Sequence, residues 1–259
     1  MRNLVQDTPS APSITAMPDA REILLETRGL GFETNGHRLL TDVDLQIRRG
    51  SRTVIMGPNG AGKSLLLRLM HGLVSPTYGD VLWRGHALDK AARQDQAMVF
   101  QRPVLLRRSA KANLKFALGV RGEKGEKRNG LIQKALAAAG LSHLANRPAR
   151  VLSGGEQQRL ATVRALACKP DILFLDEPTA SLDPASTATI EQLILEANAN
   201  GVTIVLVTHD AGQASRLGQE LIFLQDGEIA ETGPAQRVLK IPQSAPARAL
   251  RDGQLFVKS

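Results

Sequence analysis

The chain is poor in three features that each mark a class of protein. Its single cysteine, Cys168, rules out an internal disulfide and is typical of a reducing compartment. Aromatic residues make up only 3% of the chain, which leaves few rings on which single-stranded nucleic acid could stack. No apolar run approaches the roughly 20 residues of a membrane-spanning helix. With 259 residues, 42% of them hydrophobic, we expect a soluble globular protein with one large domain, with or without a subdomain.

The formal charge of +8 does not choose a partner by itself. The basic residues are scattered, apart from Arg107–Arg108 and the run Arg121–Arg128, and form no stripe along which nucleic acid would lie. Anionic lipid or a bound nucleotide explains the charge equally well. Because aromatic residues are also scarce, we expect no nucleic-acid partner.

The first part of the chain changes from a polar tail to predicted strands. Residues 1–20 mix Thr, Ser, Pro and Asp without an apolar segment, which predicts a flexible tail rather than a signal peptide. Glu22–Leu30 and Asp42–Ile47 alternate apolar and polar residues, so we expect antiparallel strands with one buried face. Continuous apolar runs predict further strands, at Thr53–Met56, Val81–Trp83, Ala97–Phe100, Ile172–Leu175, Thr203–Val207 and Leu221–Leu224.

Between these strands lies a segment of different texture, from Arg102 to about Leu166. Its helical patches are broken by glycines, which predicts a mainly helical insertion into an α/β core. The polar run Arg121–Arg128 is expected to be an exposed loop between two helices. Beyond Gly233 the pattern is mixed and predicts no particular element.

A glycine-rich loop follows the predicted strand Thr53–Met56 and precedes a predicted helix that ends near Gly72. In such a loop the backbone N–H groups close around phosphate oxygens, helped by the positive end of the helix. Lys63 can reach the outer phosphates, and the Ser64 hydroxyl can bind Mg²⁺. The expected nucleotide-binding residues are Gly57, Pro58, Asn59, Gly60, Ala61, Gly62, Lys63 and Ser64.

Two acids, Asp176 and Glu177, directly follow the apolar strand Ile172–Leu175. They should emerge at the carboxyl end of that strand, beside the glycine-rich loop. One acid can orient the shell of a Mg²⁺ ion, while the next aligns or deprotonates an attacking water. We assign the first role to Asp176 and the second to Glu177.

Ser153 and Glu156 have the spacing of a capping box at the start of a helix. A capping box does not account for the two glycines between them, because glycine weakens a first helical turn unless a ligand must approach closely. A glycine-rich helix start is also a site for an anion such as phosphate. Both interpretations remain open, so the candidate binding residues include Ser153, Gly154, Gly155 and Glu156.

The three motifs in this order, Gly57–Ser64, Leu152–Gln157 and Ile172–Glu177, resemble the nucleotide-binding subunit of ABC transporters over nearly the whole stretch from Glu22 to Gly233. The resemblance implies a P-loop NTPase core of the α/β class, with an antiparallel β subdomain and a mainly helical insertion. It implies hydrolysis of ATP with Mg²⁺ by two subunits paired head to tail. The signature Leu152–Gln157 of one subunit then faces the γ-phosphate held by the other.

Three further residues are carried over from the same resemblance. Gln101, after Val99-Phe100, resembles the Q-loop glutamine, which contacts Mg²⁺ or the lytic water. Asp183, in Ser181-Leu182-Asp183, resembles the D-loop aspartate, and His209 resembles the switch histidine. The family usually offers an aromatic ring to adenine at the position of Thr34 here. This departure puts adenine stacking in doubt and predicts relaxed base selectivity.

The predicted division of the chain is a tail (1–20), an ABC ATPase domain (21–240) with a helical subdomain (about 102–166), and a C-terminal extension (241–259). About ninety residues part Lys63 from Ser153, which leaves no room for the long coiled coils of chromosome-maintenance relatives. With one cassette and no fused membrane domain, the resemblance favours a stand-alone importer subunit. Its partners would be a second copy, membrane permease subunits and an extracytoplasmic solute-binding protein, at the cytoplasmic face of the cell membrane.

The segment Arg102–Arg108 is the expected docking site for the permease, because three apolar residues between arginines, which we expect to be exposed, suit a helix-receiving groove. The stretch Val99–Ser109 looks most like importers of oxyanions, tungstate in particular, with phosphate or molybdate close behind. Two alternatives remain: an importer subunit for another substrate, such as amino acids, and a non-transport ABC ATPase that remodels nucleic acid or protein.

Overall fold

The computed structural model describes residues 22–252. The predicted tail (1–20) lies outside these residues, as do residues 253–259 of the predicted extension. Within the described part, the chain is an α/β protein with two sheets, as predicted. No helix of this part is long and apolar enough to span a lipid bilayer.

Six strands form the central sheet of the molecule. They are β3 (Arg52–Met56), β6 (Gln96–Val99), β7 (Ile172–Asp176), β8 (Thr203–Val207), β9 (Glu220–Gln225) and β10 (Glu228–Pro234). Their order is β10-β9-β3-β8-β7-β6, and only the β9–β10 pair is antiparallel. β7 and β8 are buried along their whole length, as continuous apolar strands in a sheet covered on both faces should be.

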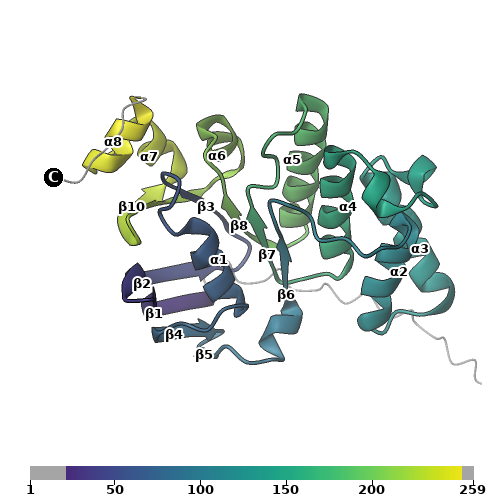
Figure 1. Ribbon diagram of the computed structural model, residues 1–259, viewed down its shortest axis with the longest axis horizontal. Helices are drawn as coiled ribbons and strands as arrows, with labels where there is room; N and C mark the ends of the chain where they lie inside the picture. The colour runs from purple at the N-terminus through teal and green to yellow at the C-terminus, as the bar shows by residue number, and fades with distance from the viewer. Residues whose placement is uncertain (1–21, 253–259) are drawn as a thin grey trace, which may run out of the picture.

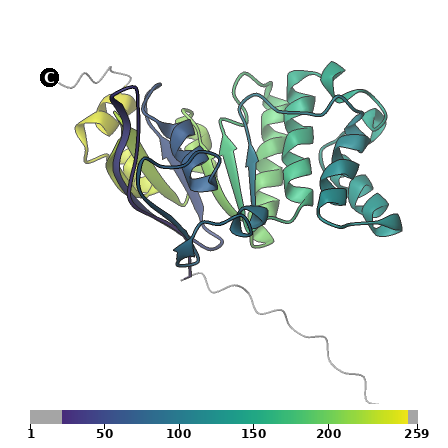
Figure 2. The same cartoon turned by 60° about the horizontal axis from the view of Figure 1, so that its bottom comes forward.

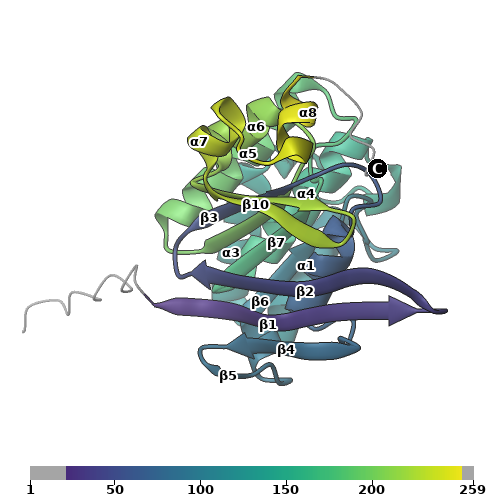
Figure 3. The same cartoon turned by 90° about the vertical axis from the view of Figure 1, so that its left-hand side faces the viewer.

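Four strands form a second, antiparallel sheet in the order β2-β1-β4-β5. They are β1 (Ile23–Thr34), β2 (His37–Arg48), β4 (Tyr78–Trp83) and β5 (His86–Ala87). The alternation expected for β2 is confirmed, because Val43, Leu45 and Ile47 are buried between exposed neighbours. This sheet forms a layer of its own beside β10 (Figure 3). Its buried face packs with α1 (Lys63–His71) and the near face of the central sheet into one apolar core.

The other helices cover the far face of the central sheet and both ends of the molecule. They are α2 (Ala110–Val120), α3 (Gly125–Ala138), α4 (Gly154–Ala167), α5 (Pro184–Ala199), α6 (Ala211–Leu217), α7 (Ala235–Lys240) and α8 (Ala245–Arg251). α4 and α5 lie side by side next to the sheet, with α2 and α3 beyond them (Figures 1 and 2). Short 3₁₀ turns connect the elements, at η1 (Ala92–Asp95), η2 (Ser142–Leu144) and η3 (Ala149–Val151).

Two sequence predictions about this helical part are wrong in detail. The run Arg121–Arg128 is not a loop throughout, because α3 already begins at Gly125 and Lys127 pairs with Glu123 at 2.9 Å. The apolar residues of Arg102–Arg108 are not all exposed, since Leu105 is buried in the core while Val104 stays exposed. Neither the start of a helix within a polar run nor the burial of one residue within an apolar run can be read from the local sequence. Both depend on which side of the segment faces a neighbouring helix.

The residues beyond Gly233, for which the sequence predicts no element, form α7 and α8. Glu231 on β10 holds them in place, because its buried carboxylate accepts hydrogen bonds from the backbone N–H groups of Gln243 and Ser244, at 2.9 Å to Oε2. The same carboxylate pairs with Arg237 of α7 at 2.7 Å. α8 therefore starts from a fixed point beside the central sheet.

Candidate functional site

The glycine-rich loop, Gln101, the two acids and His209 meet at one edge of the central sheet. β3, β8, β7 and β6 are adjacent and parallel, so their carboxyl ends lie along the same edge. Each of these ends leads directly into one of the predicted motifs, because strand and motif are continuous in sequence. A cavity of about 940 Å³ opens there. Its lining includes Gly57, Pro58, Asn59, Gly60, Gly62, Lys63, Ser64, Gln101, Glu177 and His209.

The loop before α1 has the geometry of a phosphate cradle. Its glycines at 57, 60 and 62 have φ of 148°, 84° and 95°, which favour glycine over any residue with a side chain. A Cβ on Gly57 would lie 2.0 Å from the carbonyl oxygen of Leu224. The helix cap, Gly62, has no side chain to accept a hydrogen bond from the first-turn N–H groups of α1. These N–H groups have no side-chain capping partner, and the first-turn residues that carry them line the cavity, as phosphate binding requires.

Lys63 is the cation of this loop. Its residue is only 6% exposed, and Nζ donates hydrogen bonds of 2.8 Å to the carbonyl oxygens of Gly57 and Pro58. Burial lowers the pKa of its ammonium group, and the carboxylates of Glu177 and Asp176 oppose that shift. The lysine thus sits at the floor of the cavity, held by its own loop.

Ser64 and Asp176 are paired across two elements. The Ser64 hydroxyl donates a hydrogen bond of 2.7 Å to Asp176 Oδ1. Burial raises the pKa of the Asp176 carboxyl, although the Ser64 hydrogen bond and the cations Arg68 and Lys63 act in the opposite direction. One hydroxyl and one carboxylate at this distance fit Mg²⁺, which is typically held by few protein oxygens together with phosphates and waters. Among residues 22–252, no cluster of three or more His, Cys, Asp or Glu side chains offers a fuller cage.

Glu177 is the point on which two other predicted residues converge. Gln101 Nε2 donates to Glu177 Oε2 at 3.2 Å, and His209 Nδ1 lies 3.3 Å from the same oxygen. The backbone of Glu177 has φ of 46°, a left-handed conformation that costs about 1–3 kcal/mol in a non-glycine residue. Its N–H donates to the Val207 carbonyl oxygen at 3.0 Å, which ties it to β8. The strained turn thus presents the carboxylate to the cavity between an amide and an imidazole.

The start of α4 carries the capping box that Ser153 and Glu156 predict. Glu156 Oε2 accepts from the Ser153 N–H at 2.7 Å, and Ser153 Oγ accepts from the Glu156 N–H at 3.4 Å. The Ser153 hydrogen bond lowers the pKa of the Glu156 carboxyl. Within the described chain, none of the four residues from Ser153 to Glu156 lines the 940 Å³ cavity. The structure therefore places this helix start apart from the loop of its own chain.

The two glycines of this helix start have different surroundings. A Cβ on Gly154 would meet nothing within 4 Å. A Cβ on Gly155 would lie 2.4 Å from Ser186 Oγ and 2.9 Å from its Cβ, so Gly155 allows α4 and α5 to approach closely. Packing thus explains Gly155, whereas no contact within the chain explains Gly154.

Asp183 caps α5 beside Gly155. Its carboxylate accepts from the Ser186 N–H at 2.8 Å, and this hydrogen bond lowers the pKa of the carboxyl. Asp183 is not part of the cavity lining, whereas Ser181, two residues earlier, is. In the single chain Asp183 is therefore an N-cap that the structure places near α4 and not at the loop Gly57–Ser64.

Sequence reasoning missed four apolar residues of the cavity, namely Leu39, Leu65, Ala180 and Leu250. Leu39 is 42% exposed and comes from β2, while Thr34 is exposed at the end of β1 and does not line the cavity. In the sequence, the adjacent pair Leu39-Leu40 interrupts the alternation of β2, and this was the only local signal for Leu39. Leu250 comes from α8, about 190 residues after the loop, and had no signal at all.

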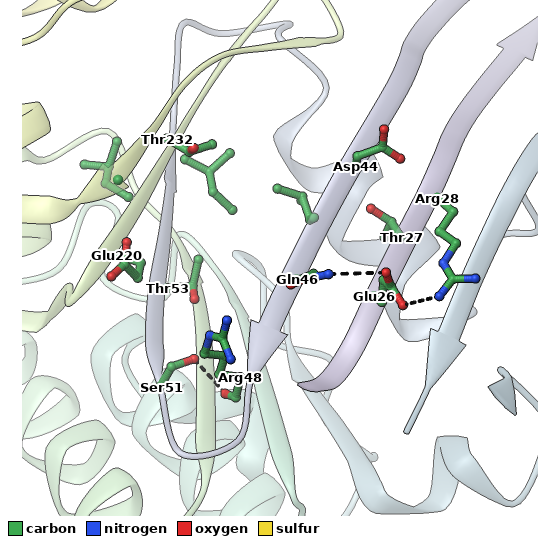
Figure 4. Close-up of a pocket in the computed structure, with 14 residues that line it drawn as sticks. Glu26, Thr27, Arg28, Asp44, Gln46, Arg48, Ser51, Thr53, Glu220 and Thr232 are labelled. Carbon is green, nitrogen blue, oxygen red and sulfur yellow. Dashed lines mark hydrogen bonds and ion pairs between the residues drawn. The ribbon is translucent and has the colours of Figure 1, made fainter. Parts of the chain in front are cut away.

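A second groove, of about 710 Å³, separates β2 from the strands β3, β9 and β10 (Figure 4). Its charged groups are of both signs and bond to one another: Glu26 accepts from Arg28 at 2.9 Å and from Gln46 at 3.4 Å. None of the predicted site residues lines this groove. The convergence of motifs therefore identifies the larger cavity, of about 940 Å³, as the site.

The comparisons with known proteins agree with this geometry. The family model described as "ABC transporter" matches residues 40–180. The chain is 37% identical over 247 residues to the phosphate import ATP-binding protein PstB 2 of Natronomonas pharaonis, covering 89% of this chain and 87% of that protein. It is 40% identical over 197 residues to the tungstate uptake system ATP-binding protein TupC of Peptoclostridium acidaminophilum, covering 76% of this chain and 92% of that protein.

A solved structure supports the same assignment. It is the dimeric post-hydrolysis state of the ATP-binding cassette MJ0796, bound to ADP and Pi. The TM-score is 0.76 at 33% sequence identity, over 82% of this chain and 99% of that one. One explanation accounts for the order of the motifs, for their meeting at one sheet edge and for the similarity to these known proteins. The chain belongs to the ABC transporter family as an ATP-binding subunit, and its activity is the hydrolysis of ATP.

Proposed function

We propose that the chain is the ATP-hydrolysing subunit of a bacterial importer and that it works with Mg²⁺. The observation that supports this best is the convergence of Gln101 and His209 on Glu177, beside the paired Ser64 and Asp176. A base, two polar groups that orient it and a pair of metal-binding oxygens are the parts that phosphoryl transfer to water needs.

The residues divide the work as follows. The N–H groups of Gly60, Gly62 and Lys63, with the Lys63 ammonium, hold the β- and γ-phosphates. Ser64 and Asp176 hold Mg²⁺, which supplies positive charge that stabilises the charge on the phosphate oxygens during transfer. Glu177 accepts the proton of the attacking water, and His209 and Gln101 keep its carboxylate aimed at that water. The water oxygen bonds to the γ-phosphorus of ATP as the bond between that phosphorus and the β–γ bridging oxygen breaks. Phosphate then leaves, and ADP stays in the loop.

The site is completed by a second copy of the chain. Gly154 is open and the start of α4 does not line the cavity of its own chain, so this helix start suits the γ-phosphate held by a partner. The known dimer of the cassette MJ0796 provides a precedent. We infer a homodimer that closes on ATP and opens after hydrolysis, with Asp183 and the signature at the interface.

The permease docks on the outer face of α2. Phe116 and Val120 are 49% and 73% exposed there, and the Arg108 guanidinium lies 5.7 Å from the centre of the Phe116 ring. A shallow cavity of about 560 Å³ at this face is lined by three cations and no acid, namely Arg108, Lys115 and Arg128. This cavity is an apolar surface with a positive rim, which fits a membrane-protein helix with an acidic end. The predicted docking segment Arg102–Arg108 is thus extended to α2.

The cargo is proposed from the relatives. PstB 2 and TupC are named for phosphate and tungstate, which supports an oxyanion such as tungstate. Relatives of 37% identity are named for glutamine and methionine, so an amino acid is the alternative. No residue of this chain would contact the cargo. We infer that an extracytoplasmic solute-binding protein delivers it to the permease, and that this subunit works at the cytoplasmic face of the cell membrane.

One substitution tests the catalytic assignment. Glu177→Gln removes the base but keeps the hydrogen-bonding shape, so the variant should bind ATP, dimerise and lose at least about 100-fold in turnover. Dimerisation is measured by size-exclusion chromatography with and without ATP, and turnover by phosphate release. Turnover within a few-fold of the wild type would refute Glu177 as the base.

A second experiment tests the biological assignment. The protein expressed from its native operon should copurify with a hydrophobic permease, and the Phe116→Asp variant should not. ATPase activity of the reconstituted complex should rise when the binding protein is supplied with tungstate, phosphate or molybdate. If glutamine or methionine stimulates the ATPase activity instead, the cargo is an amino acid and the proposed oxyanion is wrong. Stimulation by DNA or RNA in the absence of a permease would refute transport.

A further inference from the structure

A buried glutamine links the two halves of the catalytic edge. Gln213 lies in the first turn of α6 and is 1% exposed. Its amide Nε2 donates to Thr179 Oγ1 at 2.8 Å and to Glu191 Oε1 at 3.1 Å. One side chain therefore connects α6, the turn after β7 and α5.

The two elements that Gln213 joins carry two of the proposed catalytic groups. Thr179 stands two residues after Glu177, and α6 begins two residues after His209. The turn is strained, since Glu177 and Ser181 have φ of 46° and 61°. Left-handed residues of this kind persist only where neighbouring contacts hold them, at about 1–3 kcal/mol each.

The direction of the glutamine amide is set by its neighbours. Arg216 Nε and Nη2 donate to both oxygens of Glu191, at 2.9 and 2.7 Å, which fixes that carboxylate. A carboxylate accepts hydrogen bonds only, so it faces the NH₂ group of Gln213. The second proton of the same NH₂ group is then donated to the Thr179 hydroxyl oxygen. Arg216, Glu191, Gln213 and Thr179 thus form a chain from the surface of α6 to the catalytic turn.

We propose that Gln213 is a positioning residue of the ATPase reaction. It holds the turn that carries Glu177 against the helix that follows His209, and thereby sets the distance between the carboxylate and the imidazole. It touches neither ATP nor water and acts through Thr179. The inference rests on the proposed roles of Glu177 and His209.

The test compares variants that break the link at either end. Gln213→Met keeps the length of the side chain, and Thr179→Val keeps the shape of the threonine, while each removes the 2.8 Å hydrogen bond. Each should lower kcat about tenfold, the effect of one buried hydrogen bond, and leave KM for ATP within about twofold. The double variant should be no slower than Gln213→Met alone, because Thr179→Val removes only a bond that Gln213→Met has already removed. Thr179→Ser keeps the hydroxyl and should keep wild-type kcat.

A matched control comes from α7, where Gln236 bonds to a residue of the same α6. Gln236→Ala removes hydrogen bonds of 2.9 and 3.1 Å to Ser215 of α6 at the surface and should leave kcat unchanged. In a His209→Ala background, Gln213→Met should add no further loss. Wild-type kcat in both single variants, additive losses in the double variant, or a further loss in the His209→Ala background would each overturn the proposal. If Glu177→Gln retains turnover, the proposed base is wrong, and that result is independent of these comparisons.

Discussion

The starts of α1 and α4 look alike in sequence and differ in what they offer a ligand. Both are rich in glycine, and both follow the pattern of an anion site at a helix N-terminus. α1 has a glycine cap with no side chain, so its first N–H groups point into the 940 Å³ cavity. α4 has a serine cap and a glutamate that together close a capping box, and its residues lie outside that cavity.

This difference suits the two helix starts to different ligands: the start of α1 to the phosphates bound by its own chain, and the start of α4 to a phosphate bound by a partner subunit. At α1 the glycines give the backbone a shape that only a bound phosphate completes. At α4 the helix is already stable, because Ser153 and Glu156 satisfy each other, and only Gly154 is left open for an approaching group. Because its capping box is formed within its own chain, the start of α4 is stable before a ligand held by a partner subunit reaches it.

The largest expected effect tests the α1 side of this comparison. Among the described residues, Lys63 is the only lysine or arginine that lines the 940 Å³ cavity, so Lys63→Met should lower hydrolysis by at least about 100-fold, as when a charge-stabilising donor is lost. Because burial disfavours the charged ammonium, the melting temperature should fall little or not at all. Phosphate release and thermal unfolding measure the two quantities. Hydrolysis within tenfold of wild type would remove Lys63 from the site.

A smaller effect separates the two glycines of α4. Gly154→Ala meets no atom within 4 Å, so the free energy of unfolding should stay the same while turnover falls about tenfold, because the added methyl keeps the partner's phosphate away. Gly155→Ala overlaps Ser186 and should cost about 1–3 kcal/mol of stability. For a chain of this size each 1 kcal/mol lowers the melting temperature by about 2–4 °C.

The two variants serve as controls for each other. Gly154→Ala should bind ATP as a monomer with wild-type affinity, since Gly154 lies outside its own cavity. Adding Ser186→Gly to Gly155→Ala removes the overlapping atoms and should return much of the lost stability. Equal losses of stability in Gly154→Ala and Gly155→Ala would contradict the assignment of helix packing to Gly155 and ligand approach to Gly154.

The smallest effect concerns stability and pH. Burial raises the pKa of Asp176, so its charged form destabilises the nucleotide-free fold, and stability is lost as pH rises from about the unfolded value near 3.8 through the folded value. Asp176→Asn should therefore melt at a higher temperature than wild type at pH 7, and the gap should narrow toward pH 4. Unfolding curves at several pH values measure it. A variant that melts lower than wild type at pH 7 would contradict the assignment.

Much of the fold and the centre of the site could be predicted, because both follow from local patterns. Apolar runs such as Ile172–Leu175 mark buried strands, and the acids that follow them must leave at the carboxyl end of the strand. Where the patterns were mixed, prediction failed: Arg121–Arg128 looked like a loop and is half helix, and the residues after Gly233 predicted no element. Charged surface helices and short terminal helices have little apolar periodicity to reveal them.

The sequence by itself determined the order of the motifs, and with it the meeting of Lys63, Asp176 and Glu177, because neighbouring parallel strands end at one sheet edge. The tertiary structure alone decided which glycine of α4 is open, which apolar residues line the cavity, and that Gln213 reaches Thr179. Those contacts join residues from 31 to about 190 positions apart. No local pattern encodes them, since they depend on how closely two finished elements pack.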